Sequence, residues 1–310
     1  MRWRSYGAVA LAAVTAWAIG CEDSTGPAAF AARMYIADID TGSGPGTVWT
    51  YAAPYSGAGV PTDSLRFGGY RLIGVAVDAQ GNLAVIPYTG PSRVLVYDGP
   101  VHSGDTPRDS MLFLGQGALP AFGSGGKLFV PTNSNWVYVY SPPFSSASVP
   151  DTIKTGLTNS YAIAFDAQQR LYVGDIGAGA VHVFNSPYTT APAFSVTNGL
   201  TSSFNTGIAV DDSGRLYVAD YSLDHILVYD PPLSGSSTAA FAITLGVESP
   251  IGVALGSDGR LYVVNTRAAF GVVPSVTIYD PPFSSLSTPT LTMSGGGQLV
   301  QPYGIAVGPR

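Results

Sequence analysis

The fold of this chain is decided by one stretch, which reads Gly207-Ile208-Ala209-Val210, Asp211-Asp212-Ser213-Gly214-Arg215, Leu216-Tyr217-Val218-Ala219-Asp220. Two short apolar runs are separated here by a turn-forming segment, a pattern that predicts a pair of antiparallel strands. A third run extends from Ile226 to Tyr229 and is followed by Asp230-Pro231-Pro232, and a fourth extends from Phe241 to Leu245. Four short strands in one unit predict the blade of a β-propeller.

This unit is repeated six times. The run that corresponds to Leu216-Tyr217-Val218 begins at six positions, which are Met34, Leu83, Leu128, Leu171, Leu216 and Leu261. Successive starts lie 49, 45, 43, 45 and 45 residues apart, a spacing typical of propeller blades. The third run also recurs, at Val48 to Tyr51, Val94 to Tyr97, Val137 to Tyr140, Val181 to Phe184, Ile226 to Tyr229 and Val276 to Tyr279. The runs are almost continuously apolar, as expected for sheets covered on both faces by neighbouring blades.

The first copy lacks its own first strand, because nothing like Gly-Ile-Ala-Val precedes Met34. A seventh run of this type, from Tyr303 to Val307, lies near the C-terminus with no blade after it. We therefore predict an all-β fold, a six-bladed β-propeller with four-stranded antiparallel blades. The C-terminal strand should join the N-terminal blade and close the ring, so deletion of about ten C-terminal residues should unfold the domain.

The composition favours an exported protein. Hydrophobic residues make up 46% of the chain and charged residues only 11%, so uncharged polar residues must cover much of the surface. The 38 Gly and 24 Pro are spaced between short apolar runs, which argues against a helical protein. A net charge of −6 with 14 Lys and Arg provides no basic stripe, which excludes nucleic acid as the main partner. We expect the domain to be a monomer.

The N-terminus has the features of an export signal. Arg2 and Arg4 precede an apolar stretch, and small residues lead from it to Cys21, the only cysteine. The stretch is shorter than the roughly 20 residues that a membrane-spanning helix needs. Ala18-Ile19-Gly20-Cys21 resembles a bacterial lipobox, which implies that Cys21 becomes the lipidated first residue of the mature protein. The alternative is ordinary cleavage after Ala18, which would give a secreted protein with a free thiol.

The domain organisation follows from these features. We expect a signal peptide at 1–20, a flexible tether at 21–32 and the propeller at 33–310. The tether begins with the polar, turn-prone sequence Glu22-Asp23-Ser24-Thr25-Gly26-Pro27. A lipid on Cys21 would anchor the domain to a membrane of the bacterial cell envelope. An unpaired cysteine is otherwise a liability in an oxidising compartment, which favours the lipoprotein over the secreted alternative.

In the order of its strands, the chain resembles the NHL-type propellers. The resemblance rests on Gly-Ile-Ala-Val-Asp, Leu-Tyr-Val-Ala-Asp and Ile-Leu-Val-Tyr, as they stand at 207–211, 216–220 and 226–229, and it covers nearly all of 33–310. It implies the propeller fold. It does not imply one activity, because that superfamily includes protein and RNA binders, lactonases, lyases and proteins of no assigned activity.

One face of the predicted disc is the candidate working face. Loops that join the second and third strands share it with the linkers between blades, and the two longest such loops belong to blades one and six. Long loops on a rigid scaffold often carry function, so we expect ligand contacts in that sector. The candidate residues are Asp38, Asp40, Asp220, Tyr221, Glu248, Asn265, Arg267, Phe270 and Tyr303. The alternative is that these loops merely vary in length.

Polar residues end the second strand in most blades. The ring consists of Asp38, Pro87, Thr132, Asp175, Asp220 and Asn265. Their oxygens could bind a divalent cation such as Ca²⁺, but we favour the alternative that each accepts backbone N–H bonds of its own loop, with no cofactor. The three histidines have no metal-ligand spacing, and a Ser-His-Asp triad would require residues remote in sequence to converge.

These observations favour a binding or protein-interaction module displayed on the envelope, with no catalytic residues. Its ligand would be an unidentified protein, small molecule or carbohydrate. The alternative is a metal-dependent hydrolase or lyase similar to the six-bladed lactonases or the streptogramin-lyase-like propellers. Their acidic metal ligands and catalytic His have no matching positions here. Glu occurs only at Glu22 and Glu248, so Glu248 is the first acid to test by mutation.

Overall fold

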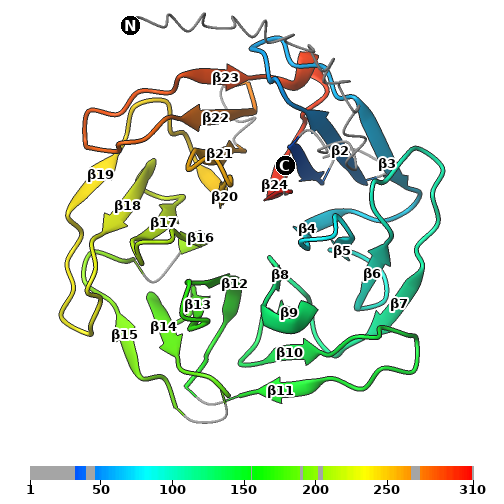
Figure 1. Ribbon diagram of the computed structural model, residues 1–310, viewed down its shortest axis with the longest axis horizontal. Coiled ribbons are helices and arrows are strands. Elements are labelled where there is room, and N and C mark those ends of the chain that lie inside the picture. Colours follow the sequence, from blue (N-terminus) through cyan, green and yellow to red (C-terminus); the bar gives the residue numbers. More distant parts are fainter. Residues whose placement is uncertain are drawn as a thin grey trace, which may run out of the picture.

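The computed structural model describes residues 32–39, 46–154, 156–188, 191–201, 205–266 and 273–308. Six four-stranded antiparallel sheets stand around a central axis, and the first strand of each sheet lies nearest to that axis (Figure 1). The prediction of a six-bladed β-propeller is therefore confirmed. None of the described residues belongs to a helix with the length and apolar character needed to cross a membrane.

The blades are numbered in chain order, and their strands are given from the axis outward. Blade one contains β24 (Pro302–Val307), β1 (Arg33–Asp38), β2 (Gly46–Ala52) and β3 (Asp63–Phe67). Blade two contains β4 (Leu72–Val77), β5 (Leu83–Pro87), β6 (Arg93–Tyr97) and β7 (Asp109–Leu112). Blade three contains β8 (Ala121–Phe122), β9 (Leu128–Pro131), β10 (Val137–Tyr140) and β11 (Asp151–Ile153).

The remaining three blades follow the same order. Blade four contains β12 (Ser160–Phe165), β13 (Leu171–Asp175), β14 (Ala180–Phe184) and β15 (Phe194–Val196). Blade five contains β16 (Asn205–Val210), β17 (Leu216–Asp220), β18 (His225–Tyr229) and β19 (Phe241–Ile243). Blade six contains β20 (Pro250–Leu255), β21 (Leu261–Asn265), β22 (Ser275–Tyr279) and β23 (Leu291–Met293). Short 3₁₀ turns occupy η1 (Ser124–Gly126) and η3 (Gly295–Gly297).

The ring is closed by two segments from opposite ends of the chain. β24 pairs with β1 in antiparallel register, with Met34 opposite Val307 and Ile36 opposite Ile305. Met34 and Ile36 are fully buried, so the closure also completes a core. The predicted completion of the N-terminal blade by the C-terminal strand is confirmed.

The described chain begins at Ala32, which already contacts blade one. Its carbonyl oxygen accepts hydrogen bonds from the Ala53 amide at 3.0 Å and from the Tyr55 hydroxyl at 3.2 Å. Ala32, the last residue of the expected tether, is thus already attached to blade one. The expected signal peptide and the rest of the tether, including Cys21, lie outside the described residues.

Glycines allow the first strands to approach one another around the axis. A Cβ atom on Gly304 would lie 2.8 Å from the carbonyl oxygen of Ile73, and one on Gly207 would lie 2.9 Å from the amide nitrogen of Val253. In both cases the neighbouring atom belongs to the first strand of the next blade. A side chain would push adjacent blades apart, which explains why the repeat begins with Gly.

Aromatic pairs join successive blades. Tyr217 of blade five packs edge-to-face on Phe283 of blade six, with ring centroids 5.6 Å apart, and Phe129 of blade three packs on Tyr188 of blade four at 5.7 Å. Such a pair contributes about 0.5–1.5 kcal/mol beyond the area it buries. Phe283 and the buried Leu233 each follow a Pro-Pro sequence and pack inward. These two Pro-containing loops are therefore structural turns.

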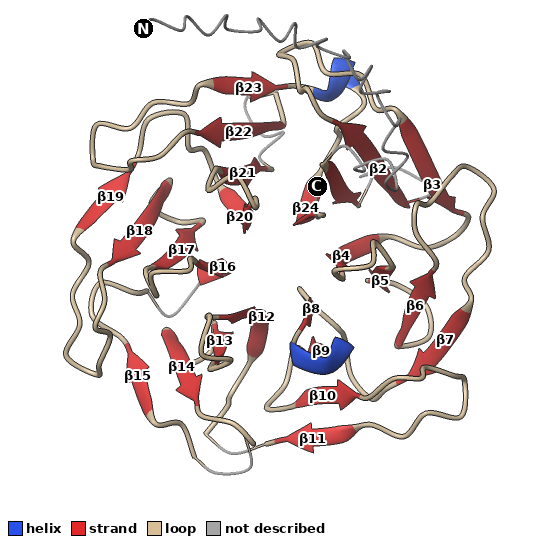
Figure 2. Cartoon of the chain, in the orientation of Figure 1, coloured by secondary structure: helices blue, strands red, loops and turns tan. Residues whose placement is uncertain are grey.

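The connections define two faces of the disc (Figure 2). The "turn face" carries the turns between first and second strands and the Pro-containing loops between third and fourth strands. The "linker face" carries the loops between second and third strands and the linkers between blades. On the turn face, the Gly214 amide donates to the Asp211 carbonyl at 2.9 Å, and the Arg215 amide donates to the Asp211 carboxylate at 2.9 Å. The expected hairpin turns are thus confirmed there.

Candidate functional site

The polar residues that end the second strands hold the linkers between blades. The Asp38 carboxylate accepts hydrogen bonds from the amides of Val300 and Gln301, both at 2.8 Å. The side-chain oxygen of Asn265 accepts one from the Glu248 amide at 2.9 Å. Each of these linkers leads into the first strand of the same blade. The two side chains therefore fix the path by which the chain enters a blade.

Asp175 and Asp220 also hold their own loops, as the sequence predicts. Asp175 accepts hydrogen bonds from Gly177 and Ala178, both at 3.0 Å. Asp220 accepts bonds from Ser222 at 2.9 Å and Leu223 at 3.2 Å. Backbone donors thus occupy carboxylates that the sequence alone left open as possible cation ligands. Among the described residues, no group of three or more His, Cys, Asp or Glu is arranged to hold a metal ion.

Asp175 is the most strongly held of these carboxylates. It is completely buried, and burial opposes its ionisation. The His182 imidazole at 3.6 Å and the hydrogen bonds from Thr158 and Asn159 outweigh that effect and hold the pKa of the carboxyl well below its usual range. Asp175 is therefore a charged structural residue of the linker face.

A serine, a histidine and an aspartate do converge in blade four. The His182 Nδ1 atom lies 2.7 Å from the Ser195 hydroxyl, and its Nε2 atom lies 3.6 Å from the Asp175 carboxylate. The second distance is too long for a hydrogen bond. The Asp175 carboxylate is instead engaged by backbone donors. This arrangement lacks the oriented imidazole that a catalytic triad requires.

The predicted site residues are only partly within the described chain. Asp40, Arg267 and Phe270 lie outside it, so most of the two long loops is not described. Asp38, Asp220 and Asn265 are buried, whereas Glu248 is exposed on the linker before blade six. Tyr221 and Tyr303 are partly exposed. Their assignment as ligand contacts stays a prediction.

Tyr221 and Tyr303 belong to a cluster that we call the tyrosine mouth, made of Tyr88, Tyr161, Tyr221, Tyr303 and Arg71. Its members come from blades one, two, four and five, at the end of the axis where the first strands begin on the linker face. Farther along the axis, residues of the first strands line a cavity of about 50 Å³. The mouth thus covers one end of the ring with polar aromatic side chains.

The environment of the mouth keeps Tyr161 and Tyr303 protonated. Burial raises the pKa of Tyr161, and the neighbouring hydroxyls of Tyr303 and Tyr88 raise it further. Burial also raises the pKa of Tyr303, with Tyr221 and Tyr88 adding to the shift and Arg71 opposing it. At neutral pH the hydroxyls of Tyr161 and Tyr303 are therefore available as hydrogen-bond donors.

Sequence reasoning missed three members of the mouth, Arg71, Tyr88 and Tyr161. A signal was present for one of them: Tyr161 and Tyr303 both stand immediately before the small residue of a first strand, where blades two and six have Ile73 and Ile251. Two tyrosines at a position that blades two and six fill with isoleucine distinguish blades one and four from the rest of the repeat.

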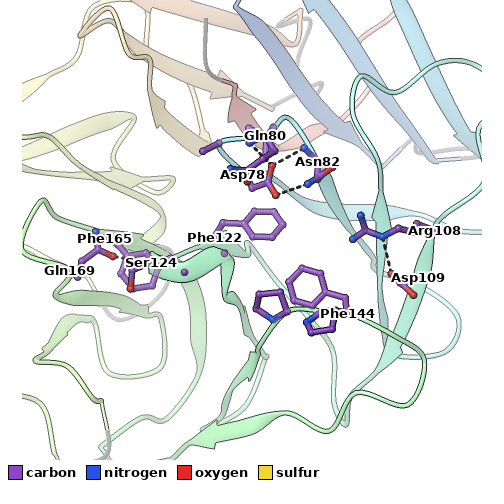
Figure 3. A pocket seen from close by; sticks show the side chains of 17 residues that line it. Asp78, Gln80, Asn82, Arg108, Asp109, Phe122, Ser124, Phe144, Phe165 and Gln169 are labelled. Carbon is purple, nitrogen blue, oxygen red and sulfur yellow. Dashed lines mark hydrogen bonds and ion pairs between the residues drawn. The ribbon is translucent and has the colours of Figure 1, made fainter.

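A second candidate site is a groove on the turn face, between blades two, three and four. It has a volume of about 1140 Å³. Figure 3 shows the rings of Phe122 and Phe144 in this groove, with Asp78 and Asn82 on one side and Arg108 on another. The working face predicted from the sequence is the linker face, on the opposite side of the disc, so this groove was not predicted.

The groove lies where one blade departs from the repeat. The second strand carries Tyr or Phe at the position of Tyr217 in five blades, but Ala84 in blade two. Phe144 therefore packs in a cluster with Ala84 rather than against a ring on that strand. Between blades five and six, where Tyr217 and Phe283 form their pair, the corresponding groove has a volume of about 720 Å³. The missing aromatic residue was the signal in the sequence.

No protein-family model and no curated protein matches the chain. The fold is similar to a chain in the crystal structure of a nidogen/laminin complex, with 16% identity, a TM-score of 0.67 and coverage of 89% of this chain and 98% of that chain. It is also similar to a protein of unknown function from Bacteroides caccae, with 10% identity, a TM-score of 0.64 and the same two coverages. At these identities the likeness shows a propeller fold alone, and the NHL-type resemblance stays a prediction.

Proposed function

We propose that this protein is an exported lipoprotein, anchored to the cell envelope through Cys21, whose propeller binds a ligand at the tyrosine mouth. The propeller fold supports a binding or interaction module at a coarse level, and one of its structural neighbours comes from a protein complex. The observation that carries the proposal is the convergence of Tyr88, Tyr161, Tyr303 and Arg71 at one end of the axis. Partly buried aromatic residues with polar groups are typical of binding sites.

The tether direction is compatible with this arrangement. β1 begins at Arg33 on the turn face, because the second strand of each blade runs from the turn face to the linker face. A tether that leads into β1 therefore joins the domain on the face opposite the mouth. A lipid anchor would leave the mouth directed away from the membrane.

Binding at the mouth is tested with a library of neutral and charged small molecules and saccharides. Ligands are detected by saturation-transfer NMR with the full chain and with the variants Tyr303→Phe and Tyr88→Ala. We expect the ligands to be lost or weakened at least tenfold, because each variant removes a hydroxyl or a ring from the mouth. Phe144→Ala, on the turn face, is the control. Loss of the ligands only in Phe144→Ala would place binding in the groove and refute the proposal.

The anchor is tested separately by expression of the wild type and Cys21→Ser in a bacterial host with metabolic fatty-acid labelling. We expect label and membrane association only for the wild type. Release of the unlabelled wild-type protein into the medium would instead support the secreted alternative.

A further inference from the structure

We infer that the tyrosine mouth takes a small molecule through an oxyanion, a carboxylate or phosphate group, held by Arg71. This inference rests on the proposed function and specifies the ligand chemistry. Arg71 immediately precedes β4, the first strand of blade two, and its guanidinium lies over the Tyr88 ring at 5.9 Å. The Nε atom of Arg71 is buried and has no hydrogen-bond partner among the described residues.

The state of Arg71 differs from that of four arginines on the turn face. Arg170, Arg215 and Arg260 each form an ion pair with an aspartate, at 2.6, 2.7 and 2.6 Å. Arg108 pairs with both Asp98 and Asp109. Within the part of the chain that the structure describes, Arg71 has no such carboxylate. A buried, unsatisfied guanidinium donor is costly, and an incoming oxyanion would satisfy it.

Among the described residues, the acids of the linker face do not neutralise Arg71. Asp38, Asp175 and Asp220 are buried and accept hydrogen bonds from backbone amides. Asp224 and Glu248 belong to the connections of blades five and six, and blade five stands across the axis from blade two (Figure 1). Within the described chain, the blade-two side of the mouth therefore carries a cation, while the exposed carboxylates of Asp224 and Glu248 belong to blades five and six.

The remaining donors suit the same ligand group. The guanidinium fork binds carboxylate and phosphate oxygens in two parallel hydrogen bonds. The hydroxyls of Tyr161 and Tyr303 stay protonated and can donate to further lone pairs of the same oxygens or, in a phosphate, to a third oxygen. Tyr161 is only 7% exposed, so the bonds would form in partly desolvated surroundings, where charge-assisted hydrogen bonds are stronger than in water.

A second cation continues this surface outward. Arg93 begins β6, the third strand of blade two, and its guanidinium lies over the Tyr70 ring at 5.9 Å. Its Nε atom is likewise buried without a partner among the described residues. An anionic ligand longer than one oxyanion would therefore extend over blade two, toward the outer strands.

The test uses the full chain and two probes, inorganic phosphate and acetate, titrated by calorimetry with the ionic strength held constant by sodium chloride. We expect saturable binding of at least one probe, and the stronger one identifies the ligand group. Arg71→Gln should weaken that binding at least tenfold, and Arg71→Lys should give an intermediate loss because it keeps the charge without the fork. If Arg71→Gln does not fold, Arg71→Lys decides the outcome.

Arg66→Gln is the matched control. Arg66 also stacks on an aromatic ring, Trp49 at 5.8 Å, but lies on the outermost strand β3 of blade one. We expect its affinity for the probes to stay within twofold of the wild type. Equal weakening by Arg66→Gln and Arg71→Gln, or no binding of either probe, would overturn the inference. A neutral ligand that is lost in Tyr303→Phe would then still support the proposed function, so the two failures are distinguishable.

Discussion

The two faces of the disc treat their charges in opposite ways. On the turn face, Arg215 and Arg260 pair with exposed aspartates, and the blades are joined by aromatic side chains. On the linker face, the carboxylate of Asp175 is buried against backbone amides, while Arg71 has no carboxylate partner within the described chain. The comparison teaches that the paired arginines of the turn face are satisfied within the fold. The cations of the linker face remain available to a ligand.

We expect the largest loss of stability from the removal of a buried carboxylate. Asp175→Ala removes a group that receives hydrogen bonds from Thr158, Asn159, Gly177 and Ala178 and leaves those donors without a charged acceptor. We expect the free energy of unfolding to fall by about 3 kcal/mol, measured by urea denaturation. A loss below about 0.5 kcal/mol, the usual range for surface substitutions, would break the distinction between the faces.

The next largest loss of stability is expected from a substitution beside the groove on the turn face. Ala84 is fully buried and shares a cluster with Phe122, so Ala84→Tyr should crowd that cluster and cost about 1–3 kcal/mol. Adding Phe122→Leu, which restores the pattern of Tyr217 in blade five and Leu255 in blade six, should recover most of the loss. Thermal unfolding of the two single variants and the double variant measures this coupling. Simple additivity would show that Ala84 and Phe122 do not compete for the same space.

The stabilisation by the buried Asp175 of the linker face should also depend on pH. Because folding lowers the pKa of Asp175, its stabilisation is present above the unfolded-state pKa and is lost as the pH falls toward the folded-state value. The unfolded-state pKa of Asp is about 4. We expect the difference in stability between the wild type and Asp175→Ala to shrink below that pH, by up to about 1.4 kcal/mol per pH unit. A constant difference down to pH 2 would contradict this account.

The smallest effect is expected for the exposed ion pairs. Asp280→Asn removes the partner of Arg260, whose Nε atom lies 2.6 Å from the Asp280 carboxylate. Both side chains are 43% exposed, so the loss should be below about 1 kcal/mol and should vanish in high salt. A loss as large as that of Asp175→Ala in the same denaturation assay would mean that the turn face also depends on its charges.

The fold could be predicted from the sequence because each blade repeats the same pattern of apolar runs and turn residues. The apolar runs predicted the strands, and the additional run from Tyr303 to Val307 predicted the closure of the ring. The tyrosine mouth was predictable only in part. Tyr221 and Tyr303 stand in an expected loop and at an expected strand start. Arg71 matters because no carboxylate among the described residues pairs with it. No spacing along the chain reports whether an arginine is paired. The groove was missed because the effect of Ala84 depends on Phe144, which lies in another blade.

The pairing of β24 with β1 has a consequence for the order of synthesis. Met34 meets Val307, so the first strand pair of the ring is made from the earliest and the latest parts of the propeller to be translated. Blades two to six can form as their residues emerge, but blade one must wait with β1, β2 and β3 exposing an unpaired edge. If the chain crosses a membrane before it folds, as the proposed export implies, this order of pairing would keep the ring open until translocation is complete.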